Sequence, residues 1–301
     1  MRTLLLMCLM MMTLIPCLGQ RPDAAVEDSA YIERIAQWRK DQEMNLKAAG
    51  GWLSVAGLYW LKEGKNTLGT AASNDIVLPV GSAPAAVGVA TLHQGKATLQ
   101  LAEGVVATVK GTRITTLEMR SDAAGLPDRV VIGALTLTII QRGTRIGIRL
   151  YDDNARSRKE FSGLKWYPID PAYRIQARFV PYDPPKTVPI TNVIGDTADT
   201  VSHGYVTFSV NGKELRLDTQ TQGDGLFINF RDLTTGKTTY PAGRFLDAPK
   251  PENGQVVLDF NQAYNPPCAF TAFATCPLPP RQNYLSVSIP AGEKTHHAEH
   301  P

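Results

Sequence analysis

After residue 51 the sequence is a succession of short apolar stretches separated by Gly, Asn, Asp and Pro residues that favour turns. Apolar and polar residues alternate at 136–139 and at 147–150. This period of two is typical of a strand with one buried face. The chain therefore predicts a mainly β fold: an N-terminal helix followed by antiparallel sheets, packed as a sandwich or distorted barrel in one or two β units. The predicted strands are 74–78, 97–101, 104–109, 135–140, 145–150, 205–210, 214–219, 226–230 and 255–260.

Two local signals refine this prediction. Asn211 and Gly212 separate two apolar stretches, which predicts a two-residue hairpin turn. Residues 179–189 are rich in proline, which removes backbone donors and predicts an extended connector or an edge strand. We place a boundary near residue 180, between an N-terminal β unit at 51–180 and a C-terminal β unit at 181–294, or between two sheets of one domain.

Residues 20–50 form an N-terminal segment with one predicted helix, at 31–48. Ser29 is a suitable N-cap, and the glycine pair at 50–51 ends the helical pattern. Apolar residues approximate one face of this helix, which predicts that it packs across a sheet.

Residues 1–19 are typical of a signal peptide: a positive start, then an apolar run at 4–15 that is too short to span a bilayer. We expect cleavage after Gly19 and export to the periplasm, the cell envelope or the extracellular space. A lipid anchor at Cys17 is disfavoured, because Pro16 stands where a small flexible residue is required. No later segment approaches 18 apolar residues, so no membrane span is predicted.

The charges are nearly balanced, with 31 Lys and Arg against 28 Asp and Glu. This balance argues against a dedicated nucleic-acid or membrane-surface binder, whose basic residues would dominate one face. The 301-residue chain has only 4 Cys, too few for a disulfide scaffold. Residues 295–301 hold three of the five His and are predicted to be a disordered tail.

The segment 257–280 is the densest in chemically distinctive residues. A strand ends there and is followed by a loop rich in proline and aromatic residues, which can be rigid without regular hydrogen bonding. In an exported protein Cys268 and Cys276 most simply form a disulfide, worth about 2.5 kcal/mol. Buried thiols, and reactive or metal-binding thiols, are the alternatives. The spacing of the two cysteines does not match a zinc site, and no metal site is predicted.

Two polar clusters are candidates for ligand binding. Arg244 could hold a carboxylate or phosphate with its planar guanidinium, or form a structural salt bridge to Asp232 or Asp259. Arg149 and Asp152 follow an alternating strand. If Arg149 points inward and Asp152 faces it, they line a polar pocket; the alternative is a solvated turn with ion pairs.

Known catalytic signatures are absent from the sequence, including the Gly-x-Ser-x-Gly elbow, His-Glu-x-x-His, the phosphate-binding glycine loop and the dinucleotide fingerprint. The adjacent Ser202 and His203 are candidates for a nucleophile and base, although adjacency in sequence does not establish such geometry. The sequence identifies no cofactor.

The runs FRDLTTGKTTYPAGRFL, LDFNQAYNPPCAF and ATCPLPPRQNYL resemble the DUF1684 family, a domain of unknown function found in bacteria and archaea. The likeness extends from about residue 31 to 294. Carried onto this chain, the family motif marks Arg149, Asp152, Phe161, Asp232, Tyr240, Arg244, Asp259, Asn261, Tyr264, Asn265, Cys268, Cys276, Asn283, Glu293 and Lys294.

A fainter resemblance links Leu68, Gly69 and residues 73–79 to the opening of a forkhead-associated phosphopeptide-binding sandwich. Thr70 stands where that family has Arg, and the Ser-Arg…His element is missing. This resemblance implies a sandwich shape and no phosphothreonine binding.

Three functions are consistent with these residues. The first is binding of a small polar or anionic ligand in a pocket near the 259–283 loop. The second is a cell-envelope hydrolase with Asp259 or Glu293 as general base and Arg244 stabilising negative charge. The third is a structural or interaction protein without a small-molecule ligand. The candidate binding residues near the loop are Arg244, Asp259, Asn261, Tyr264 and Asn265.

Overall fold

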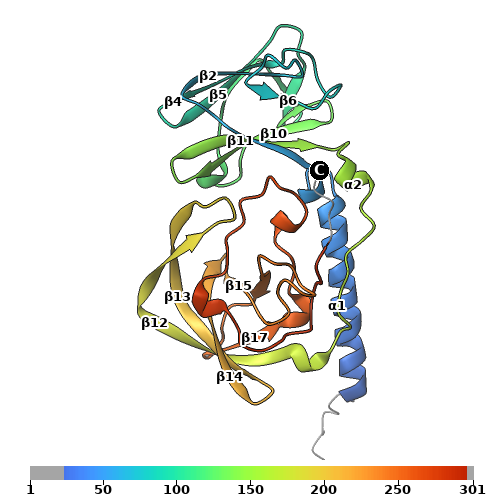
Figure 1. Ribbon diagram of the computed structural model, residues 1–301, viewed down its shortest axis with the longest axis vertical. Coiled ribbons are helices and arrows are strands. Elements are labelled where there is room, and N and C mark those ends of the chain that lie inside the picture. The colour runs from blue at the N-terminus through green and yellow to red at the C-terminus, as the bar shows by residue number, and fades with distance from the viewer. Residues whose placement is uncertain (1–23, 297–301) are drawn as a thin grey trace, which may run out of the picture.

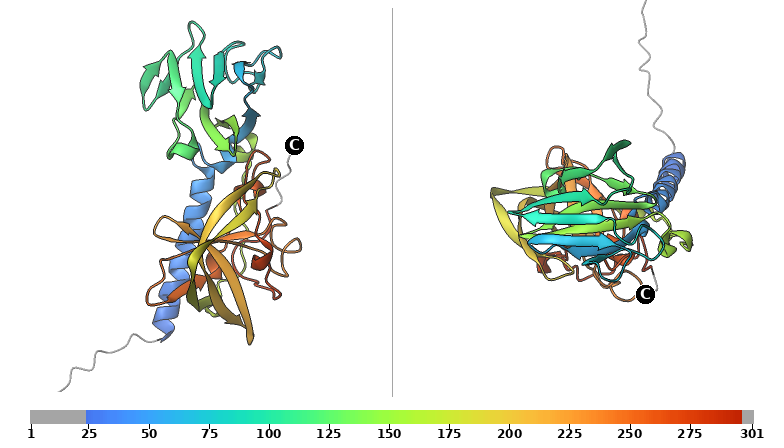
Figure 2. Two further views of the ribbon diagram at one scale, coloured as in Figure 1. Left: turned by 90° about the vertical axis from the view of Figure 1, so that its left-hand side faces the viewer. Right: turned by 90° about the horizontal axis from the view of Figure 1, so that it is seen from above.

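The computed structural model describes residues 24–296, and the side chains from residue 28 onwards. The fold is mainly β, with one long N-terminal helix before three sheets, as the sequence predicted. Figure 1 shows two stacked bodies: a first unit (residues 55–152) and a second unit (residues 174–296). The helix α1 (Ala24–Lys47) lies along the second unit and ends at the junction between the two (Figures 1 and 2).

The first unit contains two sheets with antiparallel neighbours, except for the parallel pair β2–β3. One sheet has the order β1 (Val55–Trp60), β11 (Arg145–Asp152), β10 (Leu135–Arg142), β9 (Val130–Ile132), β6 (Ala107–Val109) and β7 (Thr112–Ile114). The other has the order β3 (Ile76–Val77), β2 (Gly64–Gly69), β4 (Gly88–His93), β5 (Lys96–Leu101) and β8 (Thr116–Met119).

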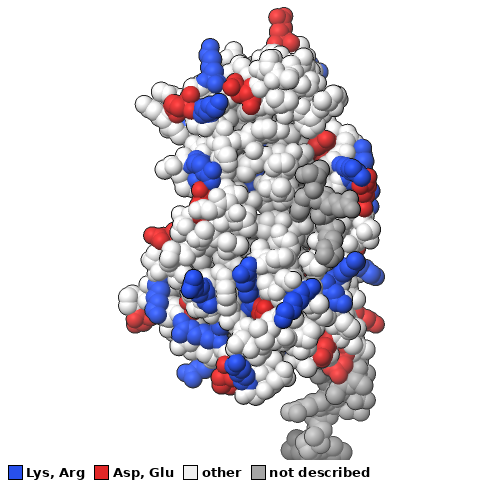
Figure 3. Space-filling view, in the orientation of Figure 1, with Lys and Arg blue, Asp and Glu red and all other residues white. Residues whose placement is uncertain are grey.

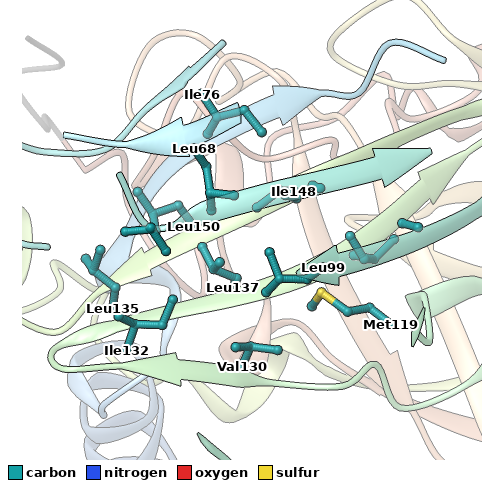
Figure 4. Packing of buried hydrophobic residues seen from close by; sticks show 14 of the residues in the cluster. Leu68, Ile76, Leu99, Met119, Val130, Ile132, Leu135, Leu137, Ile148 and Leu150 are labelled. Atoms are coloured by element: carbon teal, nitrogen blue, oxygen red, sulfur yellow. The ribbon is translucent and has the colours of Figure 1, made fainter. Parts of the chain in front are cut away.

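Alternation along β10 and β11 determines which side chains enter the core of the first unit. Leu137 on β10, and Ile148 and Leu150 on β11, point into one apolar cluster and are fully buried (Figure 4). Each such side chain contributes about 1.5–3 kcal/mol through burial. Thr138 follows Leu137 on β10, and Arg149 lies between Ile148 and Leu150 on β11. Both therefore project from the opposite face of the sheet.

The second unit is built on the sheet β16 (Arg244–Ala248), β15 (Gly225–Phe230), β14 (Lys213–Gln222), β13 (Thr197–Val210), β12 (Arg174–Thr191) and β17 (Gln255–Asp259). The predicted hairpin turn is present between β13 and β14. Asn211 and Gly212 have φ of 52° and 75°, the left-handed pair that this turn requires.

The proline-rich stretch lies within β12, which pairs with β17 only from Arg174 to Arg178. Beyond that point β12 pairs with β13 alone, as far as Thr191. The edge-strand interpretation is therefore correct, because an edge needs no donor on its open side. Residue 180 lies inside this strand, and the chain passes from β11 to β12 between residues 152 and 174. The division into domains stays a prediction.

Short helices connect the strands. They are α2 (Arg156–Lys159), η1 (Trp52–Ser54), η2 (Asp122–Ala124), η3 (Pro171–Tyr173), η4 (Phe260–Gln262), η5 (Pro267–Ala269) and η6 (Arg281–Asn283). The long helix α1 extends from Ala24, not from residue 31, because Ala and Glu precede Ser29 and continue the helix. It ends before Gly50, whose φ is +68°.

The packed chain extends further than predicted at its C-terminal end. The Thr295 amide donates to the Thr238 carbonyl at 3.0 Å, and the His296 ring lies against Phe161 and Phe270. These two residues are thus not part of a disordered tail. The remaining tail, the predicted signal peptide and the disfavoured anchor at Cys17 lie outside the described residues.

Over residues 24–296, no helix is long and apolar enough to cross a membrane. Lys and Arg are interspersed with Asp and Glu on the face shown in Figure 3, as the near-balanced composition predicts.

Candidate functional site

Arg244, the first residue of β16, is only 1% exposed and lies in a closed hydrogen-bond network. Its Nη2 donates to Asp232 Oδ2 at 3.2 Å and to the Ile289 carbonyl at 3.0 Å, and its Nη1 donates to the Ala291 carbonyl. Asp232 Oδ2 also accepts from the Ile289 amide at 2.7 Å. Burial lowers the pKa of Arg244, and the charge of Asp232 acts against this shift. Arg244 thus forms the structural salt bridge to Asp232.

Asp259 and Asn261 attach α1 to the second unit. The Tyr31 hydroxyl donates to Asp259 Oδ1 and Oδ2 at 2.9 and 3.0 Å and accepts from Asn261 Nδ2 at 2.9 Å. Asn261 also exchanges hydrogen bonds with the backbone of Asp170. Burial and the neighbouring Asp259 raise the pKa of Tyr31. These polar atoms are used within the fold.

Tyr264 and Asn265 also donate hydrogen bonds to carboxylates of the protein itself. Tyr264 donates to Asp247 Oδ2 at 3.0 Å. The backbone amide and Nδ2 of Asn265 donate to Glu293 at 2.8 and 2.7 Å. Glu293 is 2% exposed, and this burial raises its pKa to about 8. Asp259 and Glu293, the carboxylates considered for a hydrolase, thus both accept hydrogen bonds inside the protein.

Cys268 and Cys276 are free, buried thiols in this structure. The Cys268 amide donates to Cys276 Sγ at 3.2 Å, and the Tyr240 hydroxyl donates to the Cys268 carbonyl at 2.7 Å. The hydrogen bond with Cys268, together with burial, raises the pKa of Cys276. The structure thus does not contain the disulfide that the sequence favoured and shows the alternative of two buried thiols, because spacing in the chain alone does not determine whether two cysteines are bonded.

Arg149 and Asp152 do not form the pocket that was predicted for them. Residues 149 and 152 are separated by an odd number of positions along β11, so their side chains project from opposite faces of the sheet. Asp152 Oδ1 accepts from the Asn154 amide at 2.8 Å in the turn that follows. A similar alternation separates the buried Ser202 from the exposed His203 on β13.

Arg149, at the junction of the two units, differs from the residues above because part of its guanidinium has no hydrogen-bond partner among the described residues. It is 5% exposed, and its guanidinium carbon lies 5.0 Å from the centre of the Trp52 ring. Its Nε and Nη2 are buried and have no hydrogen-bond partner among the described residues. Burial lowers the pKa of Arg149. These two nitrogens form one edge of the guanidinium, the edge that binds carboxylate or phosphate in a bidentate manner.

Arg142, a second cation near Arg149, already has a counter-ion. Arg142 donates to Asp122 Oδ2 at 2.8 Å and to Thr275 Oγ1 at 2.8 Å, which ties the first unit to the 259–283 loop. The positive charge of Arg149 also reaches Cys276 and acts to lower its pKa.

Sequence reasoning missed Trp52 and Thr275 as neighbours of this site. The only local signal was an aromatic residue directly after the glycine pair that ends the helical pattern. The described residues contain no cluster of three or more His, Cys, Asp or Glu that could hold a metal ion.

Comparison with known proteins identifies a match to a family of unknown function. No curated protein matches the chain. An NMR structure of the uncharacterised protein from gene locus rrnAC0354 of Haloarcula marismortui is 32% identical, with 46% of this chain and 79% of that chain covered and a TM-score of 0.39. A chain from the crystal structure of the FhaA FHA domain complexed with the intracellular domain of Rv3910 is 14% identical, with 31% and 96% covered and a TM-score of 0.23.

Residues 159–294 match the family described as "Protein of unknown function (DUF1684)". This range contains all but the last two residues of the second unit and most of the motif residues identified in the sequence. Residues 159–294 of this chain therefore match the DUF1684 family, which the sequence motifs resemble.

Proposed function

We propose that this protein binds a small anion at Arg149, between the first unit and the 259–283 loop. The observation that carries the proposal is the buried Nε–Nη2 edge of Arg149, which has no acceptor among the described residues. A buried donor without a partner costs about 1–3 kcal/mol, and more when it is charged. A bound anion would remove this cost.

The surroundings favour an anion over a neutral ligand. Trp52 lies against the guanidinium and shields it from water, which strengthens any charge interaction there. The neighbouring cation Arg142 already has Asp122 as its counter-ion. Arg149 thus supplies a positive charge for which the described residues provide no hydrogen-bonded carboxylate.

The burial of Arg149 favours an anion of small size. With 5% of the residue exposed, the site suits inorganic phosphate or a short carboxylate. The charge of Arg149 acts on Cys276, and the adjacent Thr275 accepts from Arg142, which supports a site beside the 259–283 loop. In this proposal Arg149, and not Arg244, is the anion-binding residue.

The test is a thermal-shift titration of the full chain with sodium phosphate and with sodium acetate. Ligand at 100 times its dissociation constant stabilises a protein by about 2.7 kcal/mol, or roughly 5–10 °C in Tm. The comparison variants are Arg149→Met and Arg149→Lys. Lys retains the charge but lacks the bidentate edge, so it should bind phosphate more weakly than Arg.

Arg149→Met separates a binding role from a structural role. If the guanidinium is an uncompensated buried charge, methionine should raise Tm in anion-free buffer and abolish the response to phosphate. Arg113→Met, at an exposed position of β7, is the matched control and should behave as wild type. A wild-type response to both anions in Arg149→Met would refute the proposal.

A further inference from the structure

A cleft of about 450 Å³ separates the last turns of α1 from the segment that follows α2. The α1 wall contains Lys40, Met44 and Lys47, which share one helix face because they are four and three residues apart. The opposite wall contains Phe161 and Gly163. The cleft lies away from β10 and β11, and its volume is within the range of small-molecule sites.

The charges in the cleft are unbalanced. Lys40 and Lys47 are exposed and form no ion pair with any described residue. Glu43, the carboxylate between them, accepts from the Leu164 amide at 2.9 Å and so holds the opposite wall. Arg158 donates to the Lys47 carbonyl at 2.7 Å, which adds a third cation at that end.

Met44 and Phe161 give the cleft an apolar patch beside Glu43. Met44 is 60% exposed and so leaves an apolar side chain accessible in the cleft. Phe161 presents a ring that also contacts His296. Gly163 has a φ of +103°, and a β-carbon there would lie 3.6 Å from Glu43 Oε1. A larger residue at 163 would therefore be strained and would project toward the α1 wall.

We propose that this cleft binds an anionic amphiphile, a molecule with an apolar chain and a carboxylate end. The chain would lie on Met44 and Phe161, and the anionic end would pair with Lys40 or Lys47. The lysines are seven residues apart on α1, a separation of about 10 Å along the helix axis. With one lysine at each end of the apolar floor, a short chain could pair its charged end group with either lysine.

The test is isothermal titration of the full chain with decanoate below its micelle concentration. Acetate provides the carboxylate without the chain, and decyltrimethylammonium provides the chain with the opposite charge. The double variant Lys40→Gln/Lys47→Gln should weaken decanoate binding by up to about fivefold. The matched control, Lys213→Gln/Lys250→Gln, changes two exposed lysines of the second unit and should bind as wild type.

Three results are expected: decanoate binds more tightly than octanoate, added salt weakens its binding, and the cationic probe binds more weakly. Arg149→Met should retain wild-type decanoate affinity, so failure at one site is distinguishable from failure at the other. Equal affinity in wild type and the Lys40→Gln/Lys47→Gln variant would overturn the proposal. A twofold mass in solution, lost in Met44→Gln, with no decanoate binding, would also overturn it in favour of a second copy covering the cleft.

Discussion

Replacing Arg244 with methionine tests whether this residue stabilises the second unit or serves a ligand. Methionine has a similar length but removes three hydrogen bonds, those to Asp232, Ile289 and Ala291. It also leaves Asp232, whose residue exposure is 7%, without its cation. The two side chains of this pair are 1% and 0% exposed, so water cannot replace the lost interactions.

The magnitude follows from this burial. Removing one member of a buried ion pair costs about 3–5 kcal/mol, because the remaining charge is uncompensated. At roughly 2–4 °C per kcal/mol for a domain of this size, we expect Arg244→Met to lower Tm by about 6–20 °C. The Tm of Arg244→Lys should lie between those of Arg244→Met and wild type, since lysine keeps the charge but not the planar array of donors.

The assay is thermal unfolding of the full chain at pH 7, followed by circular dichroism. Arg281→Met is the matched control, because it removes an exposed arginine from the same unit. Phosphate titration of the same samples measures whether Arg244 affects binding at Arg149. A Tm within 2 °C of wild type in Arg244→Met, together with loss of phosphate binding, would refute the structural interpretation.

Four further predictions follow from the structure. Burial raises the pKa of Glu293 to about 8, so the protonated carboxyl should stabilise the fold at low pH, and this stabilisation should be lost as the pH rises from about 4.5 to 8. Glu293→Gln should reduce the pH dependence of the free energy of unfolding, measured with urea. Tyr31→Phe removes the hydroxyl bonded to Asp259 and should destabilise by about 1–3 kcal/mol, measured by urea unfolding. Gly292→Ala should lower Tm, because φ is +80° and the new β-carbon would come 2.5 Å from the Ala263 carbonyl oxygen. Intact-mass spectrometry of protein from the native host should show a chain that begins after Gly19 if the signal-peptide prediction is correct.

Much of the fold could be predicted because its signals are local. The strand at 145–150 follows from side-chain alternation, and the turn at Asn211 and Gly212 follows from the few residues that tolerate positive φ. The proline-rich stretch could be assigned to an edge because proline lacks a backbone donor wherever it stands. The start of α1 was placed too late, since helix ends depend on weak preferences and on packing.

The candidate site could be predicted only in part. A shared pocket for Arg149 and Asp152 was one of two interpretations of the sequence, but strand alternation places their side chains on opposite faces of the sheet. Cys268 and Cys276 were recognised as neighbours, yet their bonding depends on the path of the loop between them. For Arg244 the sequence left open a ligand or a structural salt bridge to Asp232 or Asp259, and only its partners in the fold decided for Asp232.

The sequence by itself therefore determined the periodicity, the turns and the long helix, because these arise from backbone sterics within a few residues. Only the tertiary structure decided which polar groups are already paired, because their partners are distant in the chain. Tyr31 and Asp259 are separated by 228 positions, and Arg142 and Thr275 by 133. The same long-range packing brought donors to Arg244 and left the buried edge of Arg149 without an acceptor among the described residues.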